Sequence, residues 1–222
     1  MNFFKKTLII APHLDDETLA VGGTIKKLTD NKIDVYVLII GGHLPPLYLE
    51  RDYLKTKLES VQAMKLLNVK NTFYLDIPAT EFHKDYYQSI NTQTKKIIDK
   101  IKPNTVFIPY PDRHIDHRTI FDCAMVNTRP KGNYYPKIVL AYETLSETHW
   151  NAAGIEANFN PDFFINIDKT INIKIKALKK YVSQIKGNPS RSESAIKALA
   201  KFRGSQNGCD YAEAFKLIRF IT

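Results

Sequence analysis

The sequence predicts an α/β fold: a mostly parallel sheet with helices on both faces. Short apolar segments alternate along the chain with amphipathic segments of helical period. The apolar segments are apolar at consecutive positions, as in VYVLII at 35–40, which is typical of strands buried on both faces. The length of 222 residues is enough for a core without disulfides, and we expect one domain over residues 1–222.

The predicted strands are rich in β-branched and aromatic residues. They lie at 7–11, 34–40, 71–75, 105–109, 137–142 and 163–167. The first ends at Pro12 and the second at Gly41 and Gly42, which are typical of chain turns.

The predicted helices lie between these strands and after them. They span roughly 17–30, 50–67, 88–101, 116–128, 170–185, 191–203 and 210–220. Residues 50–67 show the period most clearly, because apolar side chains recur there about every 3.6 residues. These side chains are Leu54, Leu58, Val61, Met64 and Leu67. Pro103 closes the third helix, and GNP at 187–189 separates two of the last three.

The net charge of +9 lies in one part of the chain. Residues 169–203 contain ten Lys or Arg and one acid, Glu193, so this segment alone accounts for the whole excess. The charge fits a pair of solvated helices, or attraction to a phosphorylated substrate, a membrane surface or nucleic acid. We find no RNA-type aromatic motif or zinc finger, so no nucleic-acid partner is expected.

Targeting and redox signals predict a cytoplasmic protein. No apolar run approaches the ~20 residues of a transmembrane segment, and the N-terminus lacks the long apolar region of a signal peptide. Cys123 and Cys209 do not form a CxxC pair, so we expect reduced, buried thiols.

The loop after the first strand, APHLDDE at 11–17, is dense in charge. A dinucleotide-binding loop at this place would need G-x-G-x-x-G to approach a pyrophosphate. Here Asp15 and Asp16 would repel that pyrophosphate. The loop therefore disfavours NAD binding.

A second polar stretch, PYPDRHIDHR at 109–118, follows the fourth predicted strand. In a parallel sheet both stretches open at the same edge. His13 and Asp16 are three residues apart, as are His114 and His117, so each pair can point one way from a helical turn. Zinc in catalytic sites takes three ligands of imidazole or carboxylate type. The two stretches together predict a metal site.

These motifs resemble the LmbE-like (PIG-L) family of zinc-dependent N-acetylglucosaminyl deacetylases. P-H-x-D-D-E lies near the N-terminus, and H-x-D-H follows about a hundred residues later. KLESVQAMKLLNV at 57–69 and the segment 191–215, with its AEAF, extend the resemblance over nearly the whole chain. It implies a Rossmann-like enzyme that removes the N-acetyl group from an N-acetylamino sugar or its conjugate.

The resemblance also implies residue roles. The zinc ligands would be His13, Asp16 and His117, with Fe²⁺ as the other metal that such a site binds. Asp15 would be the general base. His114 would stabilise the oxyanion or protonate the leaving amine, and Asp116 would orient a histidine. The implied partner is a small N-acetyl sugar, which an anionic group could accompany, and some family members form homo-oligomers.

Two positions depart from the family pattern. Leu14 stands where the family often has Pro. Thr56, three residues before Glu59, stands where it often has Arg, and Arg51 or Lys57 could substitute for that Arg. The second departure leaves the identity of the sugar open.

Other residues at this edge carry weaker signals. His43, Arg113 and Glu143 could face a substrate or have no role in binding. Glu17 is explained by the dipole of a helix whose first turn it occupies, and we assign it no chemistry.

Three alternative functions remain open on the sequence. The first is an amidase for a different acyl group. The second is a non-heme iron enzyme, because two His and one carboxylate also describe a facial triad. The third is a binding module that uses the basic segment 169–203.

Overall fold

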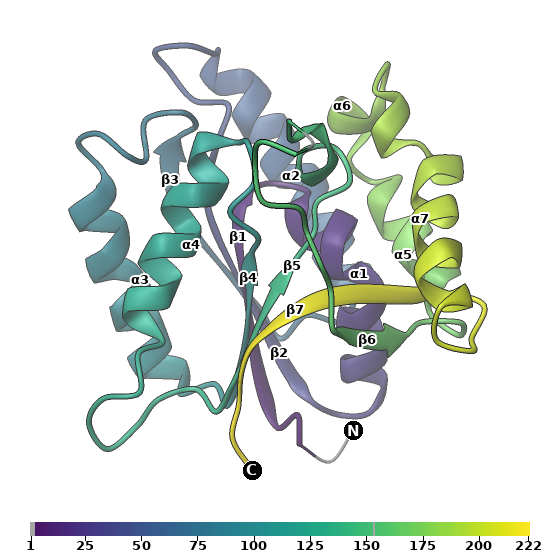
Figure 1. Cartoon of the computed structure of the whole chain (residues 1–222). Helices are drawn as coiled ribbons and strands as arrows, with labels where there is room; N and C mark the ends of the chain where they lie inside the picture. The colour runs from purple at the N-terminus through teal and green to yellow at the C-terminus, as the bar shows by residue number, and fades with distance from the viewer. Residues whose placement is uncertain (1–2, 153) are drawn as a thin grey trace.

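The computed structural model describes residues 3–152 and 154–222, which form a seven-stranded sheet of order β3-β2-β1-β4-β5-β7-β6 (Figure 1). The strands are β1 (Lys6–His13), β2 (Asp34–Gly42), β3 (Asn71–Pro78), β4 (Thr105–Pro109), β5 (Ile138–Tyr142), β6 (Phe163–Asn166) and β7 (Ala212–Phe220). The helices are α1 (Asp16–Asp30), α2 (Glu50–Leu66), α3 (Tyr87–Ile101), α4 (Ile115–Asn127), α5 (Ile171–Leu178), α6 (Val182–Ile185) and α7 (Glu193–Ser205). Two 3-10 turns are η1 (Thr148–Trp150) and η2 (Pro189–Arg191).

The strand order confirms the predicted α/β class with a mostly parallel sheet. β1 to β5 pair in parallel, and β7 runs antiparallel to β5 and β6. The chain adds β2 and β3 on one side of β1 and then crosses to β4 on the other side. The point between β1 and β4 is therefore the topological switch point, where such sheets open a crevice at the carboxyl ends of their strands.

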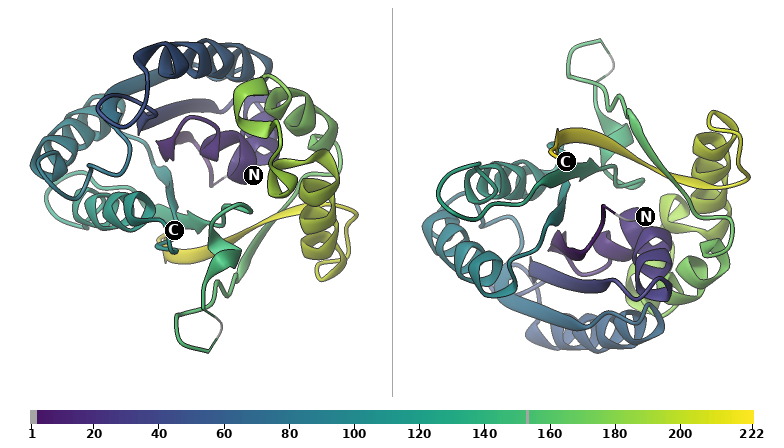
Figure 2. Two further views of the ribbon diagram at one scale, coloured as in Figure 1. Left: turned by 90° about the horizontal axis from the view of Figure 1, so that it is seen from above. Right: turned by 90° about the horizontal axis from the view of Figure 1, so that it is seen from below.

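The core has two layers because successive strand residues face opposite sides of the sheet. In β1, Leu8 and Ile10 pack toward α3 and α4, whereas Ile9 and Ala11 pack toward α1, α2 and α5. All four are buried, and Figure 2 shows helices on both sides of the sheet. Burial of one large aliphatic side chain contributes about 1.5–3 kcal/mol, so these rows hold the strand ends in place.

The prediction of a helix at 210–220 is wrong, because Ala212–Phe220 is strand β7. Its alanines, Glu213 and Lys216 favour a helix locally. In the fold, however, the segment lies between β5 and β6, pairs with both, and buries Phe215. Sheet pairing on two sides outweighs the local preference.

The helix predicted at 170–185 is interrupted. α5 ends at Leu178 and α6 begins at Val182, because the fully buried Tyr181 takes a non-helical backbone conformation between them.

α2 confirms the predicted helix at 50–67, but its apolar pattern divides between two faces. Met64 is buried in the core, whereas Leu58 is 67% exposed.

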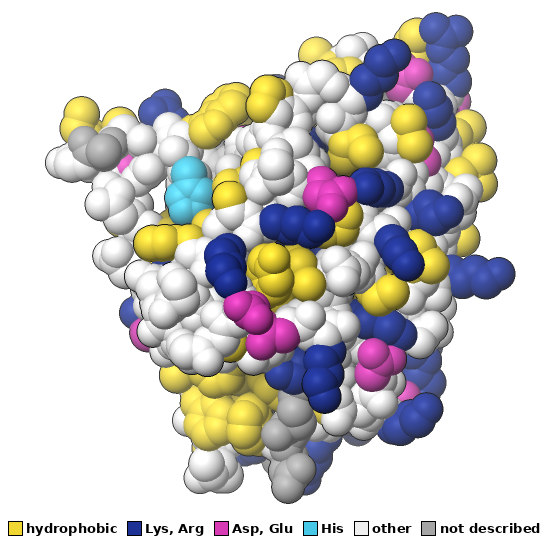
Figure 3. Space-filling view, turned by 90° about the vertical axis from the view of Figure 1, so that its right-hand side faces the viewer, with side chains coloured by type: hydrophobic (Ala, Val, Ile, Leu, Met, Phe, Trp, Pro, Cys, Tyr) yellow, Lys and Arg dark blue, Asp and Glu magenta, His cyan; other side chains and the backbone are white. Residues whose placement is uncertain are grey.

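Most of the basic segment 169–203 is neutralised within the protein. Six of its ten cations form ion pairs: Lys174, Lys179, Arg191, Lys197, Lys201 and Arg203. Figure 3 shows Lys and Arg over the face of α5, α6 and α7, with acidic and apolar side chains between them. This arrangement supports the interpretation as solvated helices.

Two remaining sequence predictions concern the burial of the two cysteines and the absence of a transmembrane segment. Cys123 is buried as predicted, Cys209 is only partly buried, and both are free. Within residues 3–152 and 154–222, no helix combines the length and the apolar character that crossing a membrane requires.

The ion pair of Lys174 and Glu213 ties β7 to α1 and α5. Its atoms are 2.6 Å apart and both side chains are buried. Glu213 also accepts the backbone N–H groups of Gly23 and Thr24. We predict that Glu213→Gln lowers the free energy of unfolding by about 3–5 kcal/mol, because it leaves a buried ammonium group without its counter-charge.

Urea denaturation measures this change. The matched control is Asp210→Asn, which removes an exposed pair with Lys201 and should leave the free energy of unfolding unchanged within error. Equal effects of the two substitutions would contradict the structural role of Glu213.

Candidate active site

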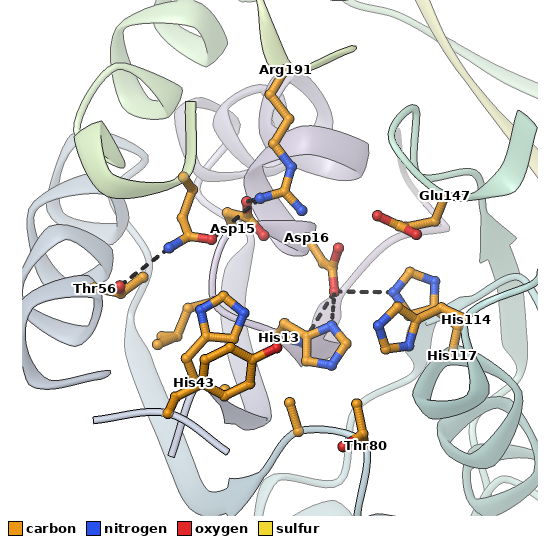
Figure 4. Close-up of a pocket in the computed structure, with 15 residues that line it drawn as sticks. His13, Asp15, Asp16, His43, Thr56, Thr80, His114, His117, Glu147 and Arg191 are labelled. Carbon is orange, nitrogen blue, oxygen red and sulfur yellow. Dashed lines mark hydrogen bonds and ion pairs between the residues drawn. The ribbon is translucent and has the colours of Figure 1, made fainter. Parts of the chain in front are cut away.

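All six of the sequence-predicted site residues meet at the carboxyl ends of β1 and β4. His13 ends β1, Asp16 begins α1, and His114, Asp116 and His117 lie at the start of α4. Five of the six line a cavity of about 180 Å³ (Figure 4). The sixth, Asp116, does not line the cavity but contacts the ring of His13. The switch point of the sheet therefore brings together two loops a hundred residues apart.

Imidazole and carboxylate atoms converge on one point of this cavity. Asp16 Oδ2 lies 3.3 Å from His13 Nδ1 and 3.4 Å from His117 Nε2. Ring nitrogens of His13, His114 and His117 lie within 4.8 Å of one another. Nε2 of His117 is buried and has no hydrogen-bond partner among the described residues. Such a donor set fits a divalent metal ion.

A second carboxylate holds each of two histidines from behind. Asp116 Oδ2 lies 2.8 Å from His13 Nε2, and Asp112 Oδ2 lies 2.9 Å from His117 Nδ1. This arrangement is typical of metal-binding histidines, because the outer carboxylate fixes the ring and its tautomer. Asp112 has no role predicted from the sequence, although it belongs to the same polar stretch, 109–118.

These carboxylates control the charge of the two histidines. Burial opposes protonation of His13, but hydrogen bonds to Asp116 and Asp16 outweigh it and raise its pKa to about 9. Burial likewise opposes protonation of His117, while Asp16 and Asp112 raise its pKa to about 10. These raised pKa values favour the doubly protonated, cationic form of both rings at pH 7 in the metal-free protein.

His114 is in the opposite state. Its Nδ1 accepts the backbone N–H of Asp116 at 3.2 Å, which caps α4. Burial and the neighbouring His13 and His117 lower its pKa to about 4. His114 is therefore neutral at pH 7, and its Nε2 carries the proton as a hydrogen-bond donor.

Asp15 lines the same cavity, but its carboxylate pairs with Arg191 and its backbone is strained. Its φ of 109° is rare for a residue with a side chain. The carboxylate lies 2.8 Å from Arg191 Nη1. Burial raises the pKa of Asp15 to about 8, against the lowering effect of Arg191.

Glu17 fixes the same loop. It is fully buried, and it accepts the backbone N–H of Asp15 at 3.1 Å and the Tyr181 hydroxyl at 2.5 Å. The helix-dipole explanation from sequence missed this role. Glu17 ties the strained turn to the segment between α5 and α6.

Several cavity residues carry no signal of their own in the sequence. They are Tyr48, Glu147, Gln184 and Arg191. Arg191 Nη1 donates to Gln184 Oε1 at 3.2 Å, and Gln184 Nε2 donates to Thr56 Oγ1 at 3.3 Å. Nε of Arg191 is buried without a hydrogen-bond partner among the described residues. Arg191 and Gln184 reach Thr56 only through the tertiary fold.

The structure separates the three weaker candidates. His43 lines the cavity, and its ring lies 4.2 Å from that of Tyr48. Arg113 lies outside the cavity, 3.7 Å from Glu156. Glu143 is also outside it and binds Arg203 and His149.

The chain is similar in sequence to known deacetylases. Residues 8–127 match the family described as GlcNAc-PI de-N-acetylase (PIG-L). The chain is 29% identical to the diacetylchitobiose deacetylase of Thermococcus kodakarensis, over 99% of this chain and 84% of that protein.

Two solved structures share the fold. The N,N'-diacetylchitobiose deacetylase of Pyrococcus horikoshii gives a TM-score of 0.78 at 24% identity, over 98% of this chain and 85% of that one. The 4-carboxy-2-hydroxymuconate hydratase of Pseudomonas putida gives 0.81 at 15% identity, over 98% of both chains. Proteins of this fold therefore include more than deacetylases.

The raised pKa values of His13 and His117 predict proton release on metal binding. A metal ion takes only the neutral form of an imidazole, so Zn²⁺ added to the metal-free protein at pH 7 should release about two protons. Affinity should rise with pH until both histidines have lost their protons, near pH 9–10.

Isothermal titration calorimetry in buffers of different ionisation enthalpy counts these protons. Asp116→Asn removes the strongest influence that raises the pKa of His13 and should reduce the release to about one. A binding heat that does not depend on the buffer would contradict the protonation states described above.

Proposed function

This chain belongs to the PIG-L (GlcNAc-PI de-N-acetylase) family, and we propose that it is a metal-dependent hydrolase that removes the N-acetyl group from an N-acetylamino sugar of GlcNAc type, or from its conjugate. One observation carries the proposal. Asp16 converges with His13 and His117, while the carboxylate of the adjacent Asp15 pairs with Arg191. This arrangement supports one aspartate as a metal ligand and the other as a proton acceptor. The names of the relatives in Thermococcus and Pyrococcus support the same reaction.

His13 Nδ1, His117 Nε2 and Asp16 Oδ2 would hold the metal, which we propose to be zinc, with Fe²⁺ as the alternative. When bound, the metal supplies Lewis-acid polarisation of the amide carbonyl and makes water more acidic. Asp116 and Asp112 keep the two imidazoles oriented from their other nitrogens.

Asp15 is the proposed general base, acting in its ionised form. Burial favours the protonated form in the metal-free protein, and the positive charges of Arg191 and of a bound metal would favour the carboxylate. As water adds to the carbonyl carbon, Asp15 takes one of its protons, and it then gives that proton to the nitrogen as the C–N bond breaks. The products are acetate and the free amine. Arg191 holds the carboxylate in position through the 2.8 Å contact, and Glu17 holds its backbone.

His114 is the proposed donor to the developing oxyanion. Its lowered pKa keeps it neutral, and the bond from the Asp116 N–H to Nδ1 leaves the proton on Nε2. A fixed donor of this kind contributes roughly 10²–10³ in rate. A ring nitrogen of His114 lies within 4.8 Å of those of His13 and His117, so we propose a substrate-side role for it and separate that role from a third histidine ligand by substitution below.

The rest of the cavity would bind the sugar. Its volume of about 180 Å³ gives room for a small ligand of about the size of one ring. The His43–Tyr48 pair offers an aromatic wall, and Arg191 offers the donor Nε. Arg191 is linked to Thr56 through Gln184. We therefore propose that Arg191 takes the place of the Arg that the family often has at position 56.

Loss of the base is the first test of the proposed reaction. Wild-type protein loaded with zinc should release acetate from a panel of N-acetylglucosamine conjugates. Asp15→Asn should retain the metal and lose roughly 10²–10⁴ in kcat. The exposed Asp99→Asn, which removes a pair with Lys95, should behave as wild type.

Two outcomes would count against this assignment. Metal binding without acetate from any conjugate would direct the search to other acyl groups. Unchanged activity of Asp15→Asn would remove Asp15 as the base.

Substitution of His114 and His117 separates a donor from a ligand. We predict that His114→Ala keeps one metal per chain and loses roughly 10²–10³ in kcat, whereas His117→Ala loses the metal. Metal analysis of the purified variants gives the readout. Loss of metal from His114→Ala would instead make it a ligand.

A further inference from the structure

α2 carries an apolar row on its outer surface. Leu54, Leu58 and Val61 are 51%, 67% and 53% exposed. Their spacing of four and three residues places them on one face of the helix. The opposite face packs into the core through Tyr53, Ala63 and Met64. Figure 2 shows α2 at the outside of the molecule, and its contacts with other helices include those with α5 and α6.

Opposite charges continue this row at its two ends. Glu50 lies four residues before Leu54, and Lys65 lies four residues after Val61, so both lie on the same face. Both are exposed, and neither forms an ion pair within the described parts of the chain. Along the helix, this face therefore presents an acidic side chain, then three apolar side chains, and then a basic side chain.

This order is self-complementary under a twofold axis. Glu50 and Lys65 are equally far from the midpoint between Lys57 and Leu58, at about 11 Å for a rise of 1.5 Å per residue. When two copies of α2 lie antiparallel across that midpoint, Glu50 of each meets Lys65 of the other. Leu54 then meets Val61, and the two Leu58 side chains meet near the axis. Lys57 is equally close to the axis, and its charge is paired within each copy with Asp76 at 2.6 Å. A twofold interface requires this kind of self-matching.

We propose that this face of α2 is a homodimer interface, and that its occupant is α2 of a second copy of this chain. The charge order favours a second copy over an unrelated partner, because the same helix supplies both members of each ion pair. The inference does not depend on the proposed deacetylation, since none of these side chains lines the cavity.

Sedimentation equilibrium of the full chain tests the interface. Wild type should be a dimer. Leu58→Glu should raise the dimer dissociation constant by about a hundredfold or more, because two like charges would be buried at the axis. Val126→Glu is the matched control, because it adds the same charge at an exposed apolar position of α4 and should leave the constant unchanged.

Charge exchange tests the antiparallel register. Glu50→Lys and Lys65→Glu should each raise the dissociation constant by about tenfold, since each change acts twice in a twofold dimer. The double variant should return to the wild-type value. Circular dichroism melting of every variant separates loss of the dimer from loss of the fold.

A monomeric wild type would overturn the proposal. So would an oligomer that Leu58→Glu leaves intact. A double variant no stronger than either single variant would overturn the antiparallel pairing on which the proposal rests.

Discussion

The burial of acidic groups at one edge of the sheet is the constraint on which the rest of this structure depends. Five carboxylates there are almost without solvent contact: Asp15, Asp16, Glu17, Asp112 and Asp116. Ionised carboxylates are costly to bury unless each has partners of opposite charge or hydrogen-bond donors. His13 and His117 lie between three of them, Arg191 faces a fourth, and the Tyr181 hydroxyl reaches the fifth. The fold must deliver these partners, and it draws them from three distant parts of the chain.

The two sides of the cavity have different origins. The loops after β1 and β4 supply the clustered histidines and aspartates, and the switch point between those strands brings the loops together. Gln184 and Arg191, together with His43 and Tyr48 after β2, line the rest of the cavity. A protein can change these lining residues while keeping the histidine cluster. This chain is similar in fold to a hydratase as well as to deacetylases, which shows that architecture alone does not define the reaction.

The features that sequence predicted are those that local patterns encode. Strands β1 to β6 follow from apolar runs, and the convergence of His13, Asp16 and His117 follows from placing two motifs at one sheet edge. The prediction of a helix at 210–220 was wrong. The composition of this segment favours a helix, but its pairing with strands far away in sequence makes it strand β7. Arg191 was missed for a similar reason, since its contact with Asp15 spans most of the chain. The period in α2 predicted a helix, but a period alone does not show which apolar residues face solvent.

The position of β7 has a consequence for synthesis of the protein. β5 pairs with β4 on one side, but its other neighbour is β7, which the ribosome makes some seventy residues later. During that interval the apolar sequence IVLAY presents an unpaired strand edge. Such an edge is a template for association between nascent chains. The protein therefore depends on a late strand to cover an early one, and its yield in cells should respond to chaperones that shield exposed strand edges.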